Sequence, residues 1–434
     1  MSEKEDLKQK IFWQIDKNAQ KLIELGKMIW NHPEPGYYEF KTAARIKEIF
    51  DSIALPSQAG LARTGIRADL SMKRPGPHIA ILGELDALIM PEHPQADPVY
   101  KSAHACGHNM QLTALAGAAL GLGGVPEVRE KLSGLIAFIA CPAEECKIDF
   151  PDESIKYLGG KAELIRRGVF DDIQISFMTH AGGSYGAAQC SNGFVMKEVI
   201  FLGKAAHAGR PSSGVNALSA ARTALNALDS QRDTFQDQDC VRIHGIIKNG
   251  GYVVNIVPEK VELEYQIRAM TPDAIRDANK KFDRSMKGAA MAFGVDVQIK
   301  TYAGYMPLYN EPELLKIHKN NLFTQRPGTE FIDFGKRTSS TDMGDVSAIM
   351  PAIHPYAGGW EGVGHTPDYH WKDDRETFVE PAKVLAANAV DLLYGDAETA
   401  QKIAKIKPRF TKTEYLAFLD TFNCEEYFSG SGKE

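Results

Sequence analysis

The sequence predicts an α/β fold, in which a mostly parallel β-sheet is flanked by helices and an α+β domain is inserted into the chain. Two observations support this prediction. Wholly apolar runs alternate with helical stretches in both end regions of the 434-residue chain, a pattern typical of parallel strands buried on both faces. The middle region instead alternates apolar and polar residues within its strands, as in a sheet with one solvated face. This length also favours two domains.

The N-terminal region alternates helices with buried strands. Helical periodicity over residues 5–31 ends at the breaker His32-Pro33-Glu34-Pro35-Gly36. The elements expected after it are a helix near 38–52, a strand at 78–85, a helix at 110–123, a strand at 135–141, a helix at 159–168 and a strand at 174–179. Ligands of such sheets bind beyond the carboxyl ends of the strands. The polar residues at these ends are Asp86, Glu144, Glu145 and His180.

The inserted domain is expected at residues 194–307, with its elements in a ferredoxin-like order. Its expected elements are strands at 194–201, 241–247, 261–268 and 295–301 and helices at 215–230 and 273–293. The chain then returns to helices at 311–320, 342–350 and 379–395 and a strand at 352–356. The first domain is therefore discontinuous, spanning 1–193 and 308–434, and the tail at 424–434 is expected to be mobile.

Composition excludes several classes of protein. The chain is 44% hydrophobic and 24% charged, so it can bury a sizeable core, and its net charge of -6 argues against broad nucleic-acid affinity. We expect no membrane-spanning segment and no signal peptide, because no apolar run is long enough and the N-terminus is charged. Six cysteines at 106, 141, 146, 190, 240 and 424 are too sparse for a disulfide scaffold. Reduced thiols in the cytoplasm are expected.

The segment Ser102–Met110 carries the most informative chemistry. Cys106 and His108 are separated by one glycine just before a predicted helix, so both side chains can reach one small volume. Thiolate and neutral imidazole are ligands for borderline-soft divalent metals. The structural alternative is a buried small residue beside a helix cap.

Acids and histidines elsewhere favour the metal site. Glu144 and Glu145 are adjacent, so one carboxylate can bind a metal while the other faces a bound water, the division of labour that metal-assisted hydrolysis needs. His180 ends the following strand, and His365 lies in a glycine-rich loop. Singly, these are ordinary structural residues, and Asp86 can equally cap the segment after its strand. Together with Cys106 and His108 they predict a site that can hold two metal ions.

Five motifs in order, between about residues 25 and 395, carry a resemblance to a known family. They are HACGHN, the CPAEE loop, GKAAHAGRPSSGVNAL, NIVPEKVELEYQIR and SSTDMGDVS with the later HPY and GHT. They resemble the co-catalytic metallopeptidases and amidohydrolases related to carboxypeptidase G and aminoacylase. Within these, the chain is similar to the subgroup of auxin-conjugate hydrolases and p-aminobenzoyl-glutamate hydrolase. The segments SSTDMGDVSAIMPAIHPY and GHTPDY most resemble its branch of β-alanyl-lysine-type dipeptidases.

The resemblance implies a zinc-exopeptidase-like catalytic domain, with the insert as lid and dimerisation domain. It implies that five residues hold two divalent ions, with Cys106 between the metals. These residues are Cys106, His108, Glu145, His180 and His365. Glu144 would be the general base, and Asp86 would orient a ligand. A histidine ligand of the wider family is replaced by Glu84 here, and His108 compensates as in the subgroup. Asn109 replaces an aspartate common in auxin-conjugate hydrolases, as in the dipeptidase branch. His104 is not a ligand in the pattern.

The implied function is hydrolysis of an amide bond in a dipeptide or an N-acyl or aminobenzoyl amino acid, through a metal-bound water and Glu144 as general base. The resemblance gives His207 the role of an oxyanion donor that reaches the partner's site in a homodimer; without it, His207 merely ends a strand. Asn255 would contact the substrate, and Arg268 would clamp a free carboxylate, although such arginines are mostly solvated surface groups.

Several alternatives stay open at this stage. Within the enzyme class, an N-acyl-amino-acid amidohydrolase or a p-aminobenzoyl-glutamate hydrolase competes with a dipeptidase. In a different class, the chain would be a non-catalytic metal-dependent binding protein. The mixed Cys/His/Glu ligand set suits zinc or manganese, and cobalt also fits. We expect a small-molecule substrate and neither nucleic acid nor membrane as partner.

Overall fold

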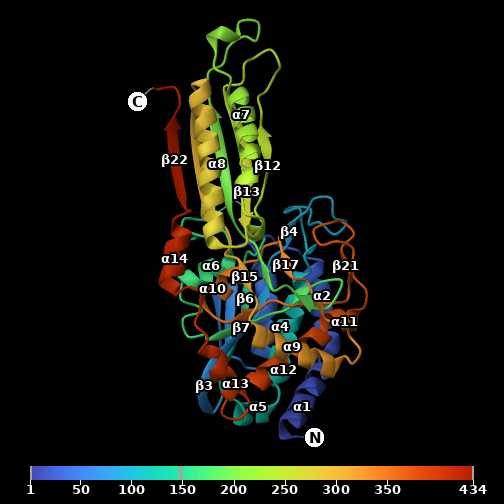
Figure 1. Ribbon diagram of the computed structural model, residues 1–434. Coiled ribbons are helices and arrows are strands. Elements are labelled where there is room, and N and C mark those ends of the chain that lie inside the picture. The colour runs from blue at the N-terminus through green and yellow to red at the C-terminus, as the bar shows by residue number, and fades with distance from the viewer. Residues whose placement is uncertain (1, 146–149, 433–434) are drawn as a thin grey trace. The chain divides into compact units, whose positions relative to one another are not determined.

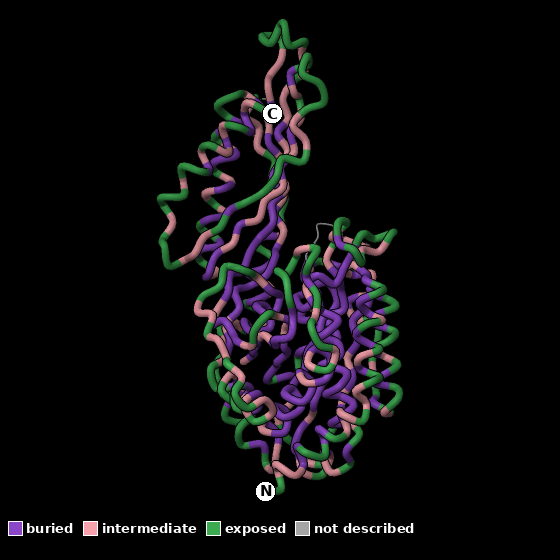
Figure 2. Tube along the Cα trace, turned by 90° about the vertical axis from the view of Figure 1, so that its right-hand side faces the viewer, coloured by how far each residue is buried: buried purple, intermediate pink, exposed green. Residues whose placement is uncertain are grey.

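The computed structural model describes residues 2–145 and 150–432. Its internal contacts divide the chain into two compact units (Figure 1). Unit 1 consists of Met1–Cys190, Tyr309–Lys336 and Asp345–Lys412, and unit 2 consists of Ser191–Leu308, Arg337–Gly344 and Thr413–Glu434. Unit 2 therefore includes 191–193, Leu308, 337–344 and 413–434, which the predicted boundaries assign to the first domain. Figure 2 shows the buried residues gathered in the interior of unit 1.

Unit 1 is built on a six-stranded sheet in the order β1-β2-β6-β3-β7-β18. Its strands are β1 Ser57–Leu61, β2 Gly65–Ser71, β3 Arg74–Glu84, β6 Ser133–Cys141, β7 Ile175–Phe177 and β18 Ala352–Ile353. β3 pairs in parallel with β6 and β7, and β18 pairs in parallel with β7. The predicted mostly parallel sheet is thus confirmed. The antiparallel pairs β1–β2 and β2–β6 were not predicted, because β1 is largely exposed and has no apolar run.

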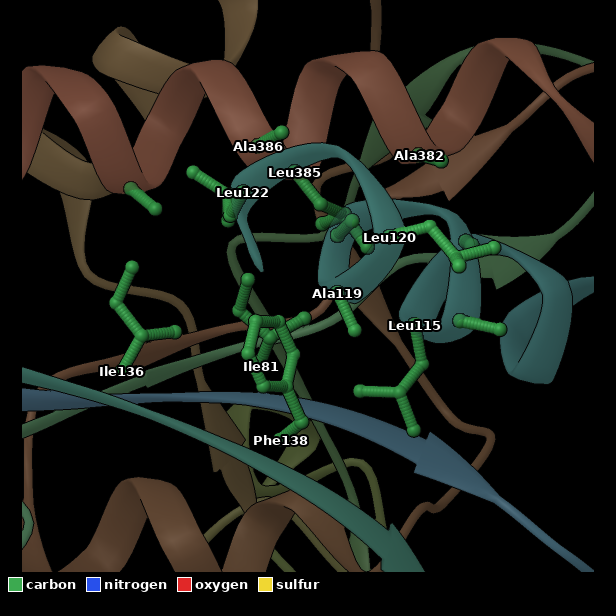
Figure 3. Packing of buried hydrophobic residues seen from close by; sticks show 14 of the residues in the cluster. Ile81, Leu115, Ala119, Leu120, Leu122, Ile136, Phe138, Ala382, Leu385 and Ala386 are labelled. Carbon is green, nitrogen blue, oxygen red and sulfur yellow. The ribbon is translucent and has the colours of Figure 1, made fainter. Parts of the chain in front are cut away.

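Helices flank this sheet. Their bounds are α1 Glu3–Lys17, α2 Ala19–Trp30, α3 Phe40–Ser52, α4 His108–Gly123, α5 Pro126–Lys131, α6 Gly160–Arg166, α9 Pro312–Gln325, α10 Met343–Ile349, α11 Asp374–Phe378, α12 Glu380–Leu393 and α13 Glu398–Ala404. Figure 3 shows Leu115 and Ala119 of α4 packed over Ile81 and Phe138 of the sheet, with α12 above them. The predicted single helix over 5–31 is two helices, because Asn18 ends α1 and begins α2.

Short strands lie in the connections of unit 1, and three of them come directly after β3, β7 and β18. They are β4 Leu88–Ile89, β5 Ser102–Ala103, β8 His180–Ala181, β9 Gly186–Ala187, β16 Ile332–Asp333, β19 Tyr356–Ala357, β20 Trp360–Glu361 and β21 His370–Trp371. β4 pairs with β5, which joins the segment after β3 to the segment before α4. β8 pairs with β19. Segments that are distant in sequence therefore meet at one end of the sheet, as parallel strands require.

Unit 2 contains a five-stranded antiparallel sheet in the order β12-β13-β11-β14-β22. Its elements are β11 Gly193–Leu202, α7 Ala217–Ser230, β12 Arg242–Asn249, β13 Lys260–Ala269, α8 Pro272–Phe293, β14 Asp296–Ala303, α14 Lys412–Asp420 and β22 Cys424–Ser429. The first six have the predicted ferredoxin-like order, and α7 packs against α8.

The C-terminal tail differs from our expectation. Residues 424–429, expected to be mobile, form β22, and all six of them pair with residues 296–301 of β14. The Tyr427 hydroxyl donates to Oδ2 of Asp296 at 2.7 Å, and the Ser429 hydroxyl donates to Oδ1 of the same residue at 2.9 Å. The edge of β14 carries backbone N–H and C=O groups, and the tail forms hydrogen bonds with them. Among the described residues, no helix has both the length and the apolar character needed to cross a bilayer.

Candidate metal centre

The turn before α4 brings Cys106 and His108 close to β8. Gly107 connects them in the left-handed region, at φ 80, which favours glycine. A Cβ at this position would lie 2.3 Å from the Cβ of Ala181, the residue after His180. The glycine therefore permits both the turn and the close approach to β8.

The five residues expected as metal ligands lie together in unit 1. Their donor atoms form two groups that share Cys106: Cys106 with His108 and His180, and Cys106 with Glu145 and His365. Within each group the atoms lie within 4.8 Å of one another. Cys106 Sγ is 3.4 Å from His180 Nε2, and His365 Nε2 is 3.1 Å from Glu145 Oε1.

This donor set fits two divalent cations. Nε2 of His108 and Oε1 of Glu145 are buried beside charged groups, Glu84 at 3.2 Å and His365 at 3.1 Å, but neither atom makes a contact of hydrogen-bond geometry among the described residues. Buried polar atoms normally make one. Burial raises the pKa of the Cys106 thiol, but the neighbouring His180 and His108 outweigh it and lower the pKa to about 6. A thiolate shared by two groups of imidazole and carboxylate donors is suited to borderline divalent ions.

Asp86 fixes the orientation of two of these residues. Its carbonyl oxygen lies 2.9 Å from His108 Nδ1, so Nδ1 carries the proton and Nε2 presents its lone pair. Its carboxylate Oδ2 accepts a hydrogen bond from the Glu145 amide at 2.7 Å. Asp86 is fully buried, and its two hydrogen bonds reach the side chain of His108 and the backbone of Glu145.

Glu144 and Glu145 point in different directions, as expected for adjacent residues at a strand end. Glu145 faces His365, whereas Oε2 of Glu144 lies 3.8 Å from Nε2 of His108. Glu144 is buried, and it follows Ala143, whose φ of 49 is unusual for a residue with a side chain. The carboxylate of Glu144 belongs to neither group that contains Cys106, but it forms a third group of donor atoms within 4.8 Å of one another together with Glu84 and His108.

His365 also has a left-handed backbone, with φ 67. Its amide donates to the carbonyl of Ala105 at 2.9 Å, which ties the glycine-rich loop to the segment that carries Cys106. Strain of this kind persists where surrounding contacts enforce it, and it is frequent at functional sites.

Sequence reasoning gave no role to a buried ion pair beneath the centre. Lys161 Nζ on α6 lies 2.5 Å from Oε1 of Glu84, and both side chains are fully buried. Oε2 of Glu84 lies 3.2 Å from His108 Nε2. Burial opposes ionisation of Glu84, but the charge of Lys161 holds its pKa well below its usual range. The sequence offered a signal for Glu84, which replaces a family histidine, and none for Lys161.

Two other histidines lie beside the centre. The ring of His354 is centred 5.1 Å from that of His180, and burial lowers its pKa well below the ordinary value. His354 belongs to the HPY motif, which supported the family resemblance without predicting a role for the histidine itself. His104 is buried, and its pKa is lowered to about 3 by burial and by His108. It belongs to neither donor group, in keeping with its omission from the expected ligands.

The remaining expected site residues belong to unit 2. His207 is exposed, and its Nδ1 accepts a hydrogen bond from the Gly209 amide at 3.0 Å. Asn255 is exposed, and its carbonyl accepts from the Ala208 amide at 2.9 Å, so these two residues belong to neighbouring turns. Arg268 on β13 donates to Ser340 Oγ at 2.9 Å and to Gln266 Oε1 at 2.6 Å. Their roles toward a substrate stay predictions.

Comparison with known proteins yields related sequences and folds. Residues 191–291 match the family model of a peptidase dimerisation domain. The chain is 32% identical over 419 residues to the Xaa-Arg dipeptidase of Mus musculus, and the match covers 91% of each protein. It is 25% identical over 343 residues to a p-aminobenzoyl-glutamate hydrolase polypeptide of Escherichia coli, covering 75% of this chain and 68% of that polypeptide.

The fold is similar to that of a solved dinuclear metal-binding peptidase of the M20 family from Bacillus subtilis. The TM-score is 0.67 at 20% sequence identity, and the match covers 87% of this chain and 99% of that chain. The parallel sheet with its flanking helices and the inserted α+β unit are therefore a known architecture.

Proposed function

Because this chain belongs to the M20 family of metal-dependent amidohydrolases and dipeptidases, we propose that it is a dipeptidase that cleaves the peptide bond of small dipeptides. The chain is a metal-dependent hydrolase of amide bonds, and the choice of a dipeptide rests on its 32% identity to the Xaa-Arg dipeptidase over 91% of both proteins. The alternatives within the class are N-acyl and p-aminobenzoyl amino acids, the latter supported by the more distant Escherichia coli relative.

The observation that carries the proposal is the pair of donor groups that share Cys106. We assign Cys106, His108, Glu145, His180 and His365 as the ligands of two divalent ions, with zinc or manganese as the expected metals and cobalt as a further option. When bound, such ions polarise a carbonyl and lower the pKa of a coordinated water.

Glu144 would carry out the proton transfers. Its carboxylate lies beside the donor atoms, 3.8 Å from His108 Nε2, and can take a proton from the attacking water. It would return that proton to the leaving nitrogen, which is otherwise expelled as a very poor amide anion. Asp86 would hold His108 and the backbone of Glu145 through its two hydrogen bonds.

Unit 2 would supply the substrate-binding side chains and the dimer contact. We assign His207 as the donor to the oxyanion, Asn255 as a polar contact and Arg268 as the partner of a free carboxylate. Support for a homodimer comes from the match of 191–291 to a dimerisation domain and from exposed apolar residues in this unit. These exposed residues are Ile246, Ile247, Tyr252, Val253, Val254 and Ile256. The open edge of β12 lies in the same unit.

A non-catalytic binding protein is the competing class. Glu144 is present and buried beside the expected ligands, and a binding protein needs no such base. The cytoplasm remains the proposed location, on the grounds of the scattered cysteines.

The proposal is tested by assaying the purified chain, loaded with manganese or zinc, on dipeptides, N-acyl amino acids and p-aminobenzoyl-glutamate. We expect turnover of dipeptides above the other two classes. Turnover confined to N-acyl or aminobenzoyl substrates would favour those alternatives. Binding without turnover of any substrate would favour the binding protein.

A further inference from the structure

A cavity of about 240 Å³ lies beside the metal centre within unit 1. One wall includes Glu145, which is an expected metal ligand. The other residues that shape it are mainly apolar, and those used below are Tyr37, Tyr38, Ala87, Leu88, Ile89 and Leu158. None of the roles predicted above uses this cavity.

The cavity is built from segments that also position the metal centre. Ala87 and β4 follow Asp86 directly, and β4 pairs with β5, which precedes Cys106. The Ala87 amide donates to the carbonyl of Glu34 at 2.8 Å, which joins β4 to the turn after α2. A Cβ on Gly36 of that turn would lie 3.0 Å from the Cα of Ala143. The cavity is therefore continuous with the backbone that presents Glu144 and Glu145.

The size of the cavity suits a part of a substrate. Binding sites for whole small molecules usually measure about 300–1,000 Å³, so this space matches a single side chain. Ile89 is 40% exposed at its rim, and the ring of Tyr100 is centred 6.2 Å from that of Tyr38. Because Ile89 lines the cavity and is partly exposed, a side chain can enter beside it and bury its apolar surface.

The polarity of the wall restricts the occupant further. None of the described residues that line the cavity is basic, and the Tyr37 hydroxyl already donates to the carbonyl of Tyr157 at 2.8 Å. The guanidinium of Arg63 lies 5.1 Å from the centre of the Tyr38 ring, but it is already bound to the Tyr37 carbonyl and to Asp152. A carboxylate placed here would therefore lose its hydration without a free basic side chain to pair with. The leaving amino acid of a dipeptide carries such a carboxylate, so the cavity suits the other half of the substrate.

We propose that this cavity binds the apolar side chain of the acyl residue, the residue whose carbonyl is attacked. The inference rests on the proposed dipeptidase function and specifies its substrate class as dipeptides with an apolar or aromatic N-terminal residue. Burial of an apolar group strengthens binding in proportion to the area buried, by roughly fourfold in affinity for each methylene. Leucyl and phenylalanyl dipeptides should therefore be hydrolysed with a higher kcat/KM than the glycyl dipeptide of the same leaving residue.

The test measures kcat/KM of the metal-loaded enzyme on glycyl, leucyl and phenylalanyl dipeptides that share one C-terminal residue. Ile89→Trp fills the rim of the cavity, and we expect it to lower the leucyl-to-glycyl ratio at least tenfold. Ile406→Trp is the matched control, because Ile406 is 37% exposed elsewhere in unit 1; its ratio should equal that of the wild type. Leu88→Ala enlarges the cavity and should raise the phenylalanyl-to-leucyl ratio.

The outcomes separate this inference from the proposed function. If the dipeptides are hydrolysed but Ile89→Trp and Leu88→Ala leave both ratios unchanged, the cavity does not bind the acyl side chain. The same conclusion follows if the two variants alter discrimination among leaving residues, tested with one acyl residue and varied C-terminal residues. If the wild type hydrolyses no dipeptide, the proposed function itself fails, and this inference fails with it.

Discussion

The amide of Ala143 donates a 2.7 Å hydrogen bond to Oε1 of the buried Glu39. On the other side of Glu144, the amide of Glu145 donates to Oδ2 of Asp86, also at 2.7 Å. Two buried carboxyl groups thus hold the backbone amides before and after the proposed general base. Oε2 of Glu39 accepts from the Thr64 hydroxyl at 2.6 Å, so Glu39 is itself fixed. These hydrogen bonds hold the left-handed backbone conformation of Ala143 and so fix the direction of the Glu144 side chain.

Removal of Glu39 should therefore reduce catalysis without removing metal. We expect Glu39→Ala to lower kcat by roughly 10–100-fold, since a small misplacement of a catalytic group has effects of this size. Glu39→Gln keeps an oxygen acceptor for Ala143 and should recover much of the rate. Steady-state kinetics with elemental analysis of bound metal check this. A fall in metal content that accounts for the lost rate would contradict the positioning role, and Thr64→Val is the control for loss of the second hydrogen bond alone.

The same residue should influence stability as a function of pH. Burial and the nearby Asp86 carboxylate raise the pKa of Glu39 to about 8, from an ordinary value of 4.5. The folded state therefore holds the proton more tightly than the unfolded state, and this contribution to stability is complete below pH 4.5 and is lost as pH rises toward 8. Glu39→Gln cannot ionise, so its free energy of unfolding should fall less across this interval. Denaturant titrations at several pH values measure the difference, and parallel profiles would contradict the raised pKa.

Glu144→Gln should abolish turnover while metal stays bound. The amide occupies nearly the same volume but cannot accept the proton, and loss of a general base typically costs about 10²–10⁴-fold. Activity assays combined with metal analysis of the same preparation test this expectation. Near wild-type turnover of this variant would show that Glu144 is not the general base.

Substitution of an expected ligand should lower metal content. We expect Cys106→Ser to affect both ions, because Cys106 belongs to both donor groups, and His365→Ala to affect the ion held with Glu145. His370→Ala is a matched control: the His370 side chain is 55% exposed and that of His365 is 52% exposed, but His370 belongs to neither group. Unchanged metal-to-protein ratios in the first two variants would exclude these residues as ligands.

Mixing two inactive variants tests whether subunits share sites. Glu144→Ala and His207→Ala each disable one contribution, so a mixed dimer retains one site with both residues intact if His207 acts on the partner subunit. Random exchange should then restore roughly a quarter of wild-type activity, because half of the dimers are mixed and each has one intact site. Subunit exchange is verified with differently tagged chains. No recovery after verified exchange would indicate that each site is complete within one chain.

Much of the fold could be predicted because apolar periodicity reports directly on burial. Strand β6 and the stretch Ile79–Leu82 of β3 are apolar runs, and α8 carries a clear apolar face. The exposed strand β1 and the tail strand β22 escaped prediction. Neither has a strong pattern of its own, and β22 forms because β14 offers it an unpaired edge.

The sequence by itself determined the donor chemistry of this protein. The thiol, imidazoles and carboxylates of HACGHN, Glu145, His180 and His365 indicate a divalent metal site, because ligand preference is a property of the side-chain type. Only the tertiary structure decided how these groups are held. Glu39 contacts Ala143 across 104 residues of sequence, and Lys161 contacts Glu84 across 77. Single hydrogen bonds and ion pairs between such distant residues have no periodicity, so no local pattern in the sequence reports them.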